Sequence, residues 1–352
     1  MKLLRCLAWP LSCLYGGAVA FRNFQYDRGW RKSVRFDVPV IGVGNLSVGG
    51  NGKTPMVEYL IRLLISGHRI GVLSRGYGRS TTGYLRVEQD AAVADVGDEP
   101  LQVKRKFPDV FVAVSEDRLT GISLMLAEQA DLEVILLDDA FQHRSVLPAL
   151  SLLLTSFNRP YWSDSLLPAG RLREPLSAIQ RADAVVITKC PENLSANESE
   201  RLRRQARLSA RQHLFFSSLK YGKPYGLFGG TFTEGIPKTV ILLTGIADAE
   251  PLVRFVKQQY PQAEHVAYRD HFRYRKTEVD RLIRRLHHEG AGSSLLLTTE
   301  KDGMRLLAFR EELQSSNVEP FCIPVELTFD AAQKTHFDEL IFSFVPLRRN
   351  ND

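Results

Sequence analysis

Cysteine is scarce in this chain of 352 residues, and the four that occur are scattered: Cys6, Cys13, Cys190 and Cys322. They form no CxxC pair and no cluster with histidine, so their spacing argues against a structural zinc site. The spacing does not suggest a disulfide framework either, and we expect a reducing compartment. Cys6 and Cys13 lie in an apolar segment, where a thiol behaves as a small hydrophobic side chain.

A large excess of one charge is also lacking. The 46 basic and 40 acidic residues leave a formal net charge of +6, and the 44% hydrophobic content is ordinary for a globular protein. This mild charge suits an anionic partner such as a lipid surface or a nucleotide, without choosing between them. Basic residues are not interleaved with aromatic ones in a stripe, so we expect no nucleic-acid partner, and we infer no obligate protein partner.

Continuous apolar runs indicate the fold class. They occupy Val40–Val43, Ile70–Leu73, Val110–Val114, Val134–Leu137, Leu152–Leu154 and Ala184–Ile187. A helical pattern from Met56 to Ile65 separates the first two runs. Strands that are apolar on both sides and alternate with helices predict an α/β fold, with a parallel sheet covered by helices on both faces. Ligands of such sheets bind at the carboxyl ends of the strands.

One glycine-rich segment lies between the first run and the helical pattern. It is a P-loop with serine in place of the usual first glycine, and it reads Ser47, Val48, Gly49, Gly50, Asn51, Gly52, Lys53 and Thr54. Its backbone N–H groups would cradle the phosphates of ATP, and Lys53 would reach the β- and γ-phosphates. Thr54 would offer its hydroxyl to Mg²⁺. The pattern therefore predicts a P-loop NTPase-like core that binds ATP and Mg²⁺.

Two pairs of adjacent carboxylates stand near this segment in the predicted fold. Asp138 and Asp139 end the run at Val134–Leu137, where P-loop enzymes hold their metal, so both are candidate metal and catalytic residues. Asp98 and Glu99 precede a proline, and such a pair could equally cap a helix. Beside a P-loop, Asp98 becomes a candidate base for a sugar hydroxyl and Glu99 a candidate substrate contact.

Four arginines are candidate contacts for the transferring phosphoryl group and for an anionic substrate: Arg75, Arg118, Arg171 and Arg173. Glu174 follows the last of them, in a cluster that is unusual for plain surface. The segment Ile187–Pro191 resembles the guanine-reading element of GTPases. Proline stands in place of its aspartate, which favours adenine over guanine.

The N-terminal segment needs an interpretation of its own. Leu3–Phe21 is mostly apolar but is interrupted by Arg5 and Pro10, and basic residues from Arg22 to Arg35 follow it. A cleaved signal peptide would place an ATP-using domain where ATP is scarce. A spanning helix and a helix packed in the core are alternatives. A helix lying in the membrane interface, with its basic flank on anionic head groups, fits the pattern best.

The last third of the chain predicts a second, smaller α/β unit. Arg201–Arg211 is a polar stretch, and Phe215–Phe228 contains glycine and proline in a pattern typical of a hinge. Thr239–Leu243 and Leu295–Leu297 then predict strands. We divide the chain into an N-terminal membrane-associated helix with its basic flank, a P-loop kinase core and a smaller lid, at residues 1–36, 37–222 and 223–352.

Seven motifs in this order resemble the tetraacyldisaccharide 4'-kinase family: VGNLSVGGNGKTP, LSRGYGR, VGDEP, LLDDAFQHR, LLPAGRLREP, VITK and TTEKD. The resemblance runs from the N-terminal helix to about Arg305. It implies phosphorylation, with ATP and Mg²⁺, of the 4'-hydroxyl of a tetraacylated glucosamine disaccharide 1-phosphate to give lipid IVA in lipid A biosynthesis. It also implies a location at the cytoplasmic face of the bacterial inner membrane and two α/β/α units joined by a two-stranded linker.

The resemblance assigns roles to individual residues as well. Asp98 would be the catalytic base, paired with His271 from the second unit, and Asp138 and Asp139 would serve the metal and phosphate. Five further residues would line the nucleotide side or the substrate side of the active site: Gln142, His143, Arg118, Arg173 and Glu174.

Three positions depart from the family pattern. Phe272, Ala140 and Gly303 stand where the family often has histidine, glycine and alanine. Ala140 and Gly303 remove no side chain that is given a role, whereas Phe272 stands in place of a second histidine beside His271. Two other functions stay open at this point: a soluble P-loop metabolic kinase whose first helix is part of the core, and a nucleotide-dependent switch that acts on a partner protein.

Overall fold

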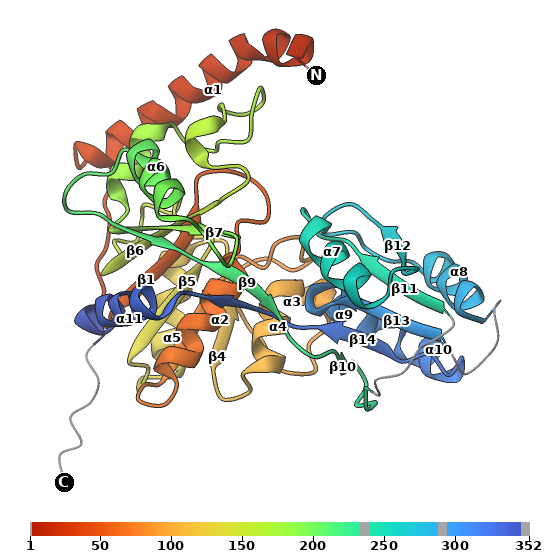
Figure 1. The fold of residues 1–352 in the computed structure, drawn as a ribbon. Helices are drawn as coiled ribbons and strands as arrows, with labels where there is room; N and C mark the ends of the chain where they lie inside the picture. Colours follow the sequence, from red (N-terminus) through yellow and green to blue (C-terminus); the bar gives the residue numbers. More distant parts are fainter. Residues whose placement is uncertain (1, 233–238, 288–293, 346–352) are drawn as a thin grey trace.

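The computed structural model describes residues 2–232, 239–287 and 294–345 and shows an α/β protein built of two units (Figure 1). The core unit contains a sheet with the strand order β3-β4-β2-β5-β1-β6-β7-β8. The second unit contains a sheet with the order β10-β14-β13-β11-β12, and a two-stranded sheet of β15 and β9 joins the units. The predicted fold class is confirmed.

The core sheet is parallel around its centre. Strand β1 (Val40–Asn45) lies between β5 (Val134–Asp138) and β6 (Leu150–Ser156) and runs parallel to both. The sheet continues in parallel through β2 (Ile70–Ser74), β4 (Phe111–Val114), β7 (Ala184–Thr188) and β8 (His213–Phe216). The short edge strand β3 (Leu85–Arg86) is antiparallel to β4. Each predicted core strand is present, with ends that differ by one or two residues.

Helices cover both faces of this sheet. On one face lie α2 (Lys53–Leu64), α3 (Val93–Val96), α4 (Asp98–Lys106) and α11 (Ala331–Phe344), packed against strand residues such as Ile41 and Val43. On the other lie α5 (Arg118–Glu128) and α6 (Ala196–Ala206), against residues such as Val40 and Val185. Because successive side chains of a strand point to opposite faces, apolar residues are needed at every position, as the continuous runs indicated.

The second unit repeats the design on a smaller scale. Its parallel strands are β11 (Thr239–Thr244), β12 (Glu264–Ala267), β13 (Ser294–Thr299) and β14 (Pro320–Ile323), and β10 (Tyr225–Gly226) is antiparallel to β14. Its helices are α7 (Glu250–Gln259), α8 (Lys276–His287), α9 (Glu300–Leu306) and α10 (Arg310–Ser315). Short 3₁₀-helices occur at Tyr161–Ser163, Leu176–Arg181 and Leu307–Phe309.

Two antiparallel strands connect the units. They are β9 (Ser218–Tyr221) and β15 (Val325–Thr328), and β15 leads the chain back to the core (Figure 1). Helix α11 then packs on the core, where the ring of Phe337 lies 5.7 Å from that of Tyr59 and 5.0 Å from that of Phe215. The sequence-based division placed all of 223–352 in the lid, but this aromatic contact holds the C-terminal helix on the core.

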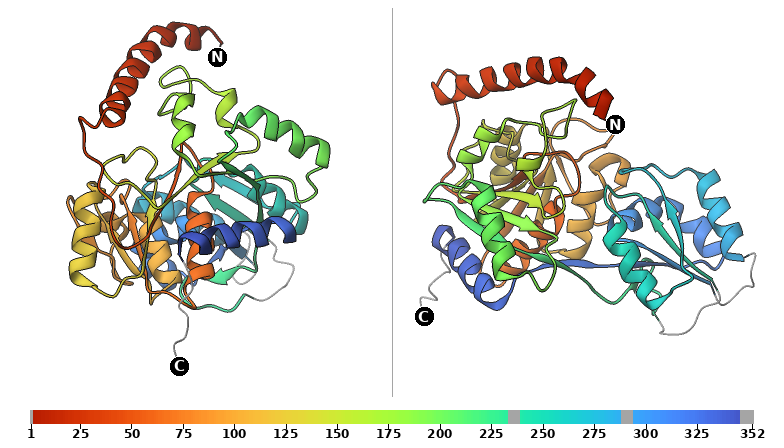
Figure 2. Two further views of the ribbon diagram at one scale, coloured as in Figure 1. Left: turned by 90° about the vertical axis from the view of Figure 1, so that its left-hand side faces the viewer. Right: turned by 45° about the horizontal axis from the view of Figure 1, so that its top comes forward.

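Helix α1 (Lys2–Asp27) lies along the outside of the core, separated from the sheet (Figures 1 and 2). Its inner side chains bond to the loop before β7: Ser12 Oγ donates to the Leu166 carbonyl at 3.1 Å, and Asn23 Nδ2 donates to Glu174 at 2.9 Å. Large apolar side chains such as Trp9 and Leu14 point outward, with 64% and 73% of their surface exposed. Within the described residues, no helix has the length and apolar content to cross a bilayer.

Candidate active site

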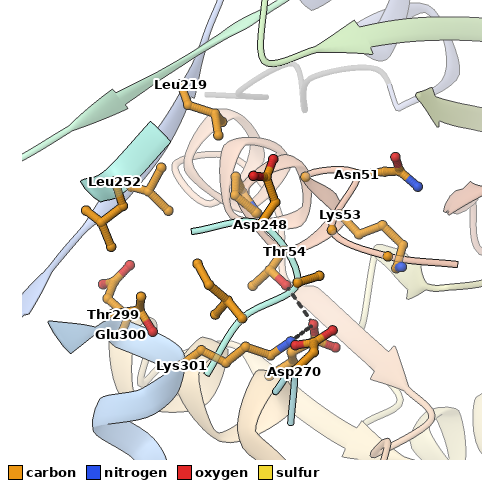
Figure 3. A pocket seen from close by; sticks show the side chains of 18 of the residues that line it. Asn51, Lys53, Thr54, Leu219, Asp248, Leu252, Asp270, Thr299, Glu300 and Lys301 are labelled. Atoms are coloured by element: carbon orange, nitrogen blue, oxygen red, sulfur yellow. Dashed lines mark hydrogen bonds and ion pairs between the residues drawn. The ribbon is translucent and has the colours of Figure 1, made fainter. Parts of the chain in front are cut away.

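A pocket of about 370 Å³ opens between the two units, at the carboxyl ends of the core strands. Figure 3 shows Asn51, Lys53 and Thr54 from the core beside Leu252 and Lys301 from the second unit. Parallel sheets place their ligand sites at this end. The linker strands border the pocket as well, so both units and their connection contribute to one site.

The P-loop lies where β1 gives way to α2. Gly49 and Gly52 adopt the left-handed conformation, with φ of 116° and 81°, which only glycine adopts without strain. Helix α2 begins at Lys53, and its first N–H groups are free for an anion. The hydroxyl of Thr188 donates to the Asn51 carbonyl at 3.0 Å, and the Asn51 side chain bonds back to Ser47. These contacts fix the shape of the cradle.

Asp138 and Asp139 are neighbours with opposite environments. Burial and the nearby charge of Glu99 raise the pKa of Asp138 to about 6, and its Oδ1 atom has no hydrogen-bond partner in the described part of the chain. Burial would also raise the pKa of Asp139, but Lys53 and Arg173 outweigh it and hold that pKa well below its usual range. Lys53 Nζ lies 3.6 Å from Asp139 Oδ1, and Arg173 donates two hydrogen bonds to the same carboxylate.

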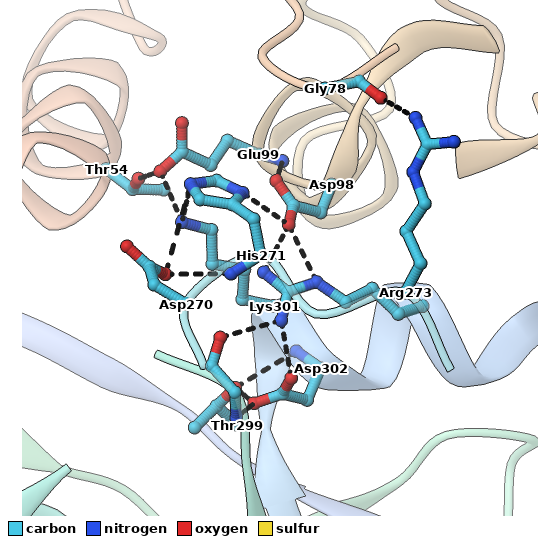
Figure 4. A network of polar contacts seen from close by, with 12 residues as sticks. Thr54, Gly78, Asp98, Glu99, Asp270, His271, Arg273, Thr299, Lys301 and Asp302 are labelled. Carbon is cyan, nitrogen blue, oxygen red and sulfur yellow. Dashed lines mark hydrogen bonds and ion pairs between the residues drawn. The ribbon is translucent and has the colours of Figure 1, made fainter. Parts of the chain in front are cut away.

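Asp98 and His271 meet across the boundary between the units (Figure 4). Asp98 is the first residue of α4, and His271, in the left-handed conformation with φ of 53°, follows β12. His271 Nδ1 lies 3.1 Å from Asp98 Oδ2. Burial would raise the pKa of Asp98, but the hydrogen bond with His271 and the charges of Lys301 and Arg305 hold it well below its usual range. The carboxylate is therefore ionised at neutral pH.

Glu99 faces the P-loop from the same turn of α4. Its Oε1 atom lies 3.4 Å from the Thr54 hydroxyl and 2.8 Å from Lys301 Nζ. Lys301 Nζ is also 3.3 Å from His271 Nε2. Burial would lower the pKa of Lys301, but Glu99 and Asp98 raise it, so the amine stays protonated. A cation of the second unit thus stands between the P-loop and the Asp98–His271 pair.

The pocket contains eleven of the residues proposed from the sequence: Val48, Gly49, Gly50, Asn51, Gly52, Lys53, Thr54, Glu99, Asp139, Arg173 and His271. Asp98, Asp138 and Ser47 lie directly behind them and contact them. The geometry therefore gathers the P-loop, the paired aspartates and the Asp98–His271 pair into one site.

Two of the proposed substrate contacts are buried away from the pocket. Arg118 is fully buried and donates to the backbone carbonyls of Ser115 and Asp138, so it holds the end of β5. Glu174 is buried too, and accepts from Arg181 at 2.8 Å. Arg75 and Arg171 are exposed. A sequence motif could not distinguish a buried supporting arginine from a solvent-facing one.

Gln142 and His143 lie in the turn after β5, behind the P-loop strand. Gln142 Nε2 donates to the Asn45 carbonyl at 3.0 Å. Burial and the charge of Arg118 lower the pKa of His143 to about 4, so its imidazole is neutral at pH 7. Gln142 therefore supports the strand end that carries the P-loop.

The three departures from the family pattern are accommodated by local packing. Phe272 stacks on Tyr268 with ring centroids 4.4 Å apart. Ala140 is buried in the core. A Cβ atom at Gly303 would lie 2.4 Å from the sulfur of Cys322, so glycine leaves the room that this cysteine occupies. None of these positions alters the pocket wall.

Similarity to known proteins agrees with this geometry. A profile of the family described as tetraacyldisaccharide-1-P 4'-kinase matches residues 4–343. The chain belongs to this kinase family. A relative named tetraacyldisaccharide 4'-kinase from Parabacteroides distasonis is 40% identical over 98% of this chain and 96% of its own length. One from Porphyromonas gingivalis is 41% identical over 94% and 95%.

A solved structure gives the same assignment. A crystal structure of LpxK from Aquifex aeolicus in complex with ATP aligns with a TM-score of 0.73 and 32% identity. It covers 97% of this chain, and the alignment spans 99% of the Aquifex chain. The kinase-family fold therefore extends over both units and the linker.

Proposed function

We propose that this chain transfers the γ-phosphoryl group of ATP to the 4'-hydroxyl of tetraacyldisaccharide 1-phosphate and so produces lipid IVA for lipid A biosynthesis. The observation that carries this proposal is that His271, which pairs with Asp98 directly behind it, lines the same pocket as the P-loop. The P-loop accounts for a nucleotide, and the pair accounts for an alcohol acceptor. The names of the relatives supply the identity of that acceptor.

The reaction needs little covalent work from the protein. The sugar oxygen bonds to the γ-phosphorus, the bond from that phosphorus to the β-bridging oxygen breaks, and ADP leaves. The hydroxyl proton passes to the Asp98–His271 pair. Positioning and charge stabilisation supply most of the rate in such transfers, and Lys53, Arg173 and Lys301 are among the cations that line the pocket.

The residues at the end of β5 suit Mg²⁺. Asp138 Oδ1 is buried without a hydrogen-bond partner among the described residues, and carboxylate and hydroxyl oxygens are the ligands that Mg²⁺ prefers. We propose that Thr54, Asp138 and Asp139 hold the ion directly or through water. When bound, Mg²⁺ neutralises charge on the phosphates. Among the described residues no cluster of three or more metal-binding side chains occurs.

An apolar wall beside the P-loop is the proposed place for adenine. It is lined by Leu219, Tyr221, Leu252 and Val325 from the linker and the second unit. Lys189, which ends the VITK motif, pairs with Asp248 at 2.8 Å at this side of the pocket. Lys189 therefore forms an ion pair that connects the two units. Pro191 stands where a guanine-reading aspartate would be, which favours adenine.

Helix α1 supports a membrane location. Trp9, Leu14 and Phe21 expose apolar surface while the opposite side of the helix bonds to the core. The acyl chains of the lipid leave a bilayer only at about 0.8 kcal/mol per CH₂, so the enzyme has to reach the interface. We propose that α1 lies in the anionic surface of the inner membrane at its cytoplasmic face, and that exposed Arg75 and Arg171 contact the substrate.

A labelling assay tests the proposal. Purified protein is incubated with γ-labelled ATP, Mg²⁺ and tetraacyldisaccharide 1-phosphate in mixed micelles, beside Lys53→Ala and the surface control Lys257→Ala. We expect labelled lipid from wild type and Lys257→Ala, and at least about 1,000-fold less from Lys53→Ala, which lacks the phosphate-contacting amine. Free labelled phosphate without labelled lipid would exclude the lipid kinase and favour a nucleotide-dependent switch.

A further inference from the structure

Arg305 is a buried arginine of the second unit that reaches into the core. It lies in α9, and 7% of its surface is exposed. Its Nε atom donates to Asp98 Oδ2 at 2.8 Å, and its Nη2 atom donates to the same oxygen. Arg305 does not line the pocket, so it has no direct path to either substrate. Arg305 contacts the core through the carboxylate of Asp98, which is the proposed base.

The opposite edge of the guanidinium is fixed within the second unit. Arg305 Nη1 donates to Asp302 Oδ1 at 2.7 Å and to the Gly245 carbonyl at 2.8 Å. Asp302 is fully buried and in turn accepts from the Gly245 N–H and the Tyr274 hydroxyl. The orientation of the Arg305 guanidinium is therefore fixed by residues of the second unit.

Gly245 gives a second indication that this place is shaped for the arginine. A Cβ atom there would lie 2.9 Å from both Arg305 Nη1 and Asp302 Oδ1. Only glycine at this position, directly after β11, lets its carbonyl and the two side chains come this close. The close approach makes the guanidinium rigid, which a donor that orients another group requires.

The contacts of Asp98 come from both units. Asp98 Oδ2 accepts hydrogen bonds from Arg305 and lies 3.1 Å from His271 Nδ1. Asp98 Oδ1 accepts a hydrogen bond from the Glu99 N–H at 2.9 Å. The core fixes one oxygen and the second unit fixes the other. The plane of the carboxylate, and hence its alignment with His271, depends on where Arg305 stands.

We propose that Arg305 is a positioning residue that aligns Asp98 with His271 when the second unit closes on the core. The inference rests on the proposed function, since it gives Asp98 and His271 their part in the reaction. This role differs from that of an ion pair that only connects the two units, because any cation could form such a pair. Alignment of the carboxylate needs a guanidinium, which donates through two N–H groups of fixed geometry. The groups that face Asp98 in this arrangement are His271, Lys301, Arg305 and Glu99.

Arg305→Met and Arg305→Lys test this role, with the exposed residue Arg310 changed to methionine as the control. For Arg305→Met we expect kcat to fall about 100-fold, while KM for ATP and the Kd for ADP stay within about threefold. The acid limb of the kcat profile should move to higher pH, because a charge that lowers the pKa of Asp98 is gone. Arg305→Lys should recover about tenfold of the loss, since it keeps the charge but only one prong.

Two results would overturn the inference. One is a kcat of Arg305→Met within threefold of wild type. The other is an equal loss in Arg305→Met and Arg305→Lys with an unmoved acid limb, which would mean a structural bridge. If Arg305→Met does not fold, Gly245→Ala replaces it: crowding the arginine should lower kcat at least about fivefold, and an unchanged kcat would count against alignment. A wild-type protein that labels no lipid would instead overturn the proposed function.

Discussion

The two walls of the pocket are built in different ways. The core wall presents backbone N–H groups from one continuous segment, Ser47–Thr54, held by two left-handed glycines and the start of a helix. The second-unit wall presents side-chain charges from separate segments, His271 on the loop after β12 and Lys301 on α9. The proposed phosphate site is therefore a local property of the chain, while the proposed acceptor side is assembled only when the two units meet.

Ion pairs make most of the polar contacts between the walls. Lys301 of the second unit pairs with Glu99 of the core at 2.8 Å. Two lysines of the core pair with acids of the second unit at the same distance, Lys189 with Asp248 and Lys106 with Glu300. Polar interfaces of this kind between domains can open and close, unlike an apolar core. We infer that the second unit opens to exchange nucleotide and closes for the reaction.

The contrast between the two walls would be wrong if the charges of the second-unit wall took no part in the reaction and this wall only covered the pocket. Lys301→Met tests this most strongly. Removing the cation leaves Glu99 and Asp98 close together and poorly compensated, so we expect kcat to fall about 30- to 100-fold. Steady-state kinetics with the lipid substrate measure the effect.

Lys276→Met is the matched control, because Lys276 lies on α8 with 68% of its side chain exposed. It should behave as wild type. A Lys301→Met enzyme with kcat within threefold of wild type would show that the charges of the second wall do not take part in the reaction.

In the core wall, Asp138 and Asp139 have pKa values that are shifted in opposite directions, and these shifts affect the stability of the fold. Asp138→Asn removes a carboxylate whose pKa is raised from 3.8 to about 6 in the folded protein. The raised value means that ionised Asp138 destabilises the fold above pH 6, and that this cost disappears below about pH 4. We expect the variant to be more stable than wild type by about 1 to 2 kcal/mol at pH 7, and inactive. Urea unfolding at pH 7 and pH 4 measures the difference.

Asp139→Asn is the neighbouring control with the opposite sign. The pKa of Asp139 is held low by Lys53 and Arg173 against its burial, so its ionised form stabilises the fold above its unfolded pKa near 3.8. This variant should be less stable than wild type at pH 7. If both asparagine variants shift stability in the same direction, the assignment of different environments to the two aspartates is wrong.

The sequence reveals the core wall better than the second wall for the same physical reason. A P-loop needs glycines, lysine and threonine at fixed spacing, so the pattern of Gly49, Gly52, Lys53 and Thr54 predicts the cradle by itself. The strands could be predicted because burial on both faces requires continuous apolar runs. The packing of α11 on the core could not, because it depends on Phe337 meeting Phe215 from a distant segment.

Arg305 and Lys301 show what sequence patterns leave out. Both lie in or just after the TTEKD motif, whose spacing predicts no role for its charged residues. Their partners, Asp98 and Glu99, are about 200 residues earlier in the chain, so no spacing rule connects them. The one available signal was the presence of charged residues at the end of the apolar run Leu295–Leu297, where a parallel sheet places its ligand site.

The smallest expected effect concerns the connection of α1 to the core wall. The Tyr15 hydroxyl donates to the Arg173 carbonyl at 2.9 Å, and the Arg173 guanidinium bonds Asp139, which lies beside Lys53. Tyr15→Phe removes one hydrogen bond worth about 1 kcal/mol and keeps the ring, so we expect kcat to fall about two- to fivefold.

Tyr26→Phe controls for the loss of a hydroxyl from the same helix, because Tyr26 packs by its ring against Arg144 and phenylalanine preserves that contact. Vesicle binding should be equal for wild type and both variants, since the exposed side chains Trp9 and Leu14 are untouched. A fall in kcat for Tyr15→Phe at unchanged vesicle binding would show that α1 supports the core wall independently of membrane contact. Equal loss of kcat and of vesicle binding would instead mean that the helix acts only by bringing the enzyme to its substrate.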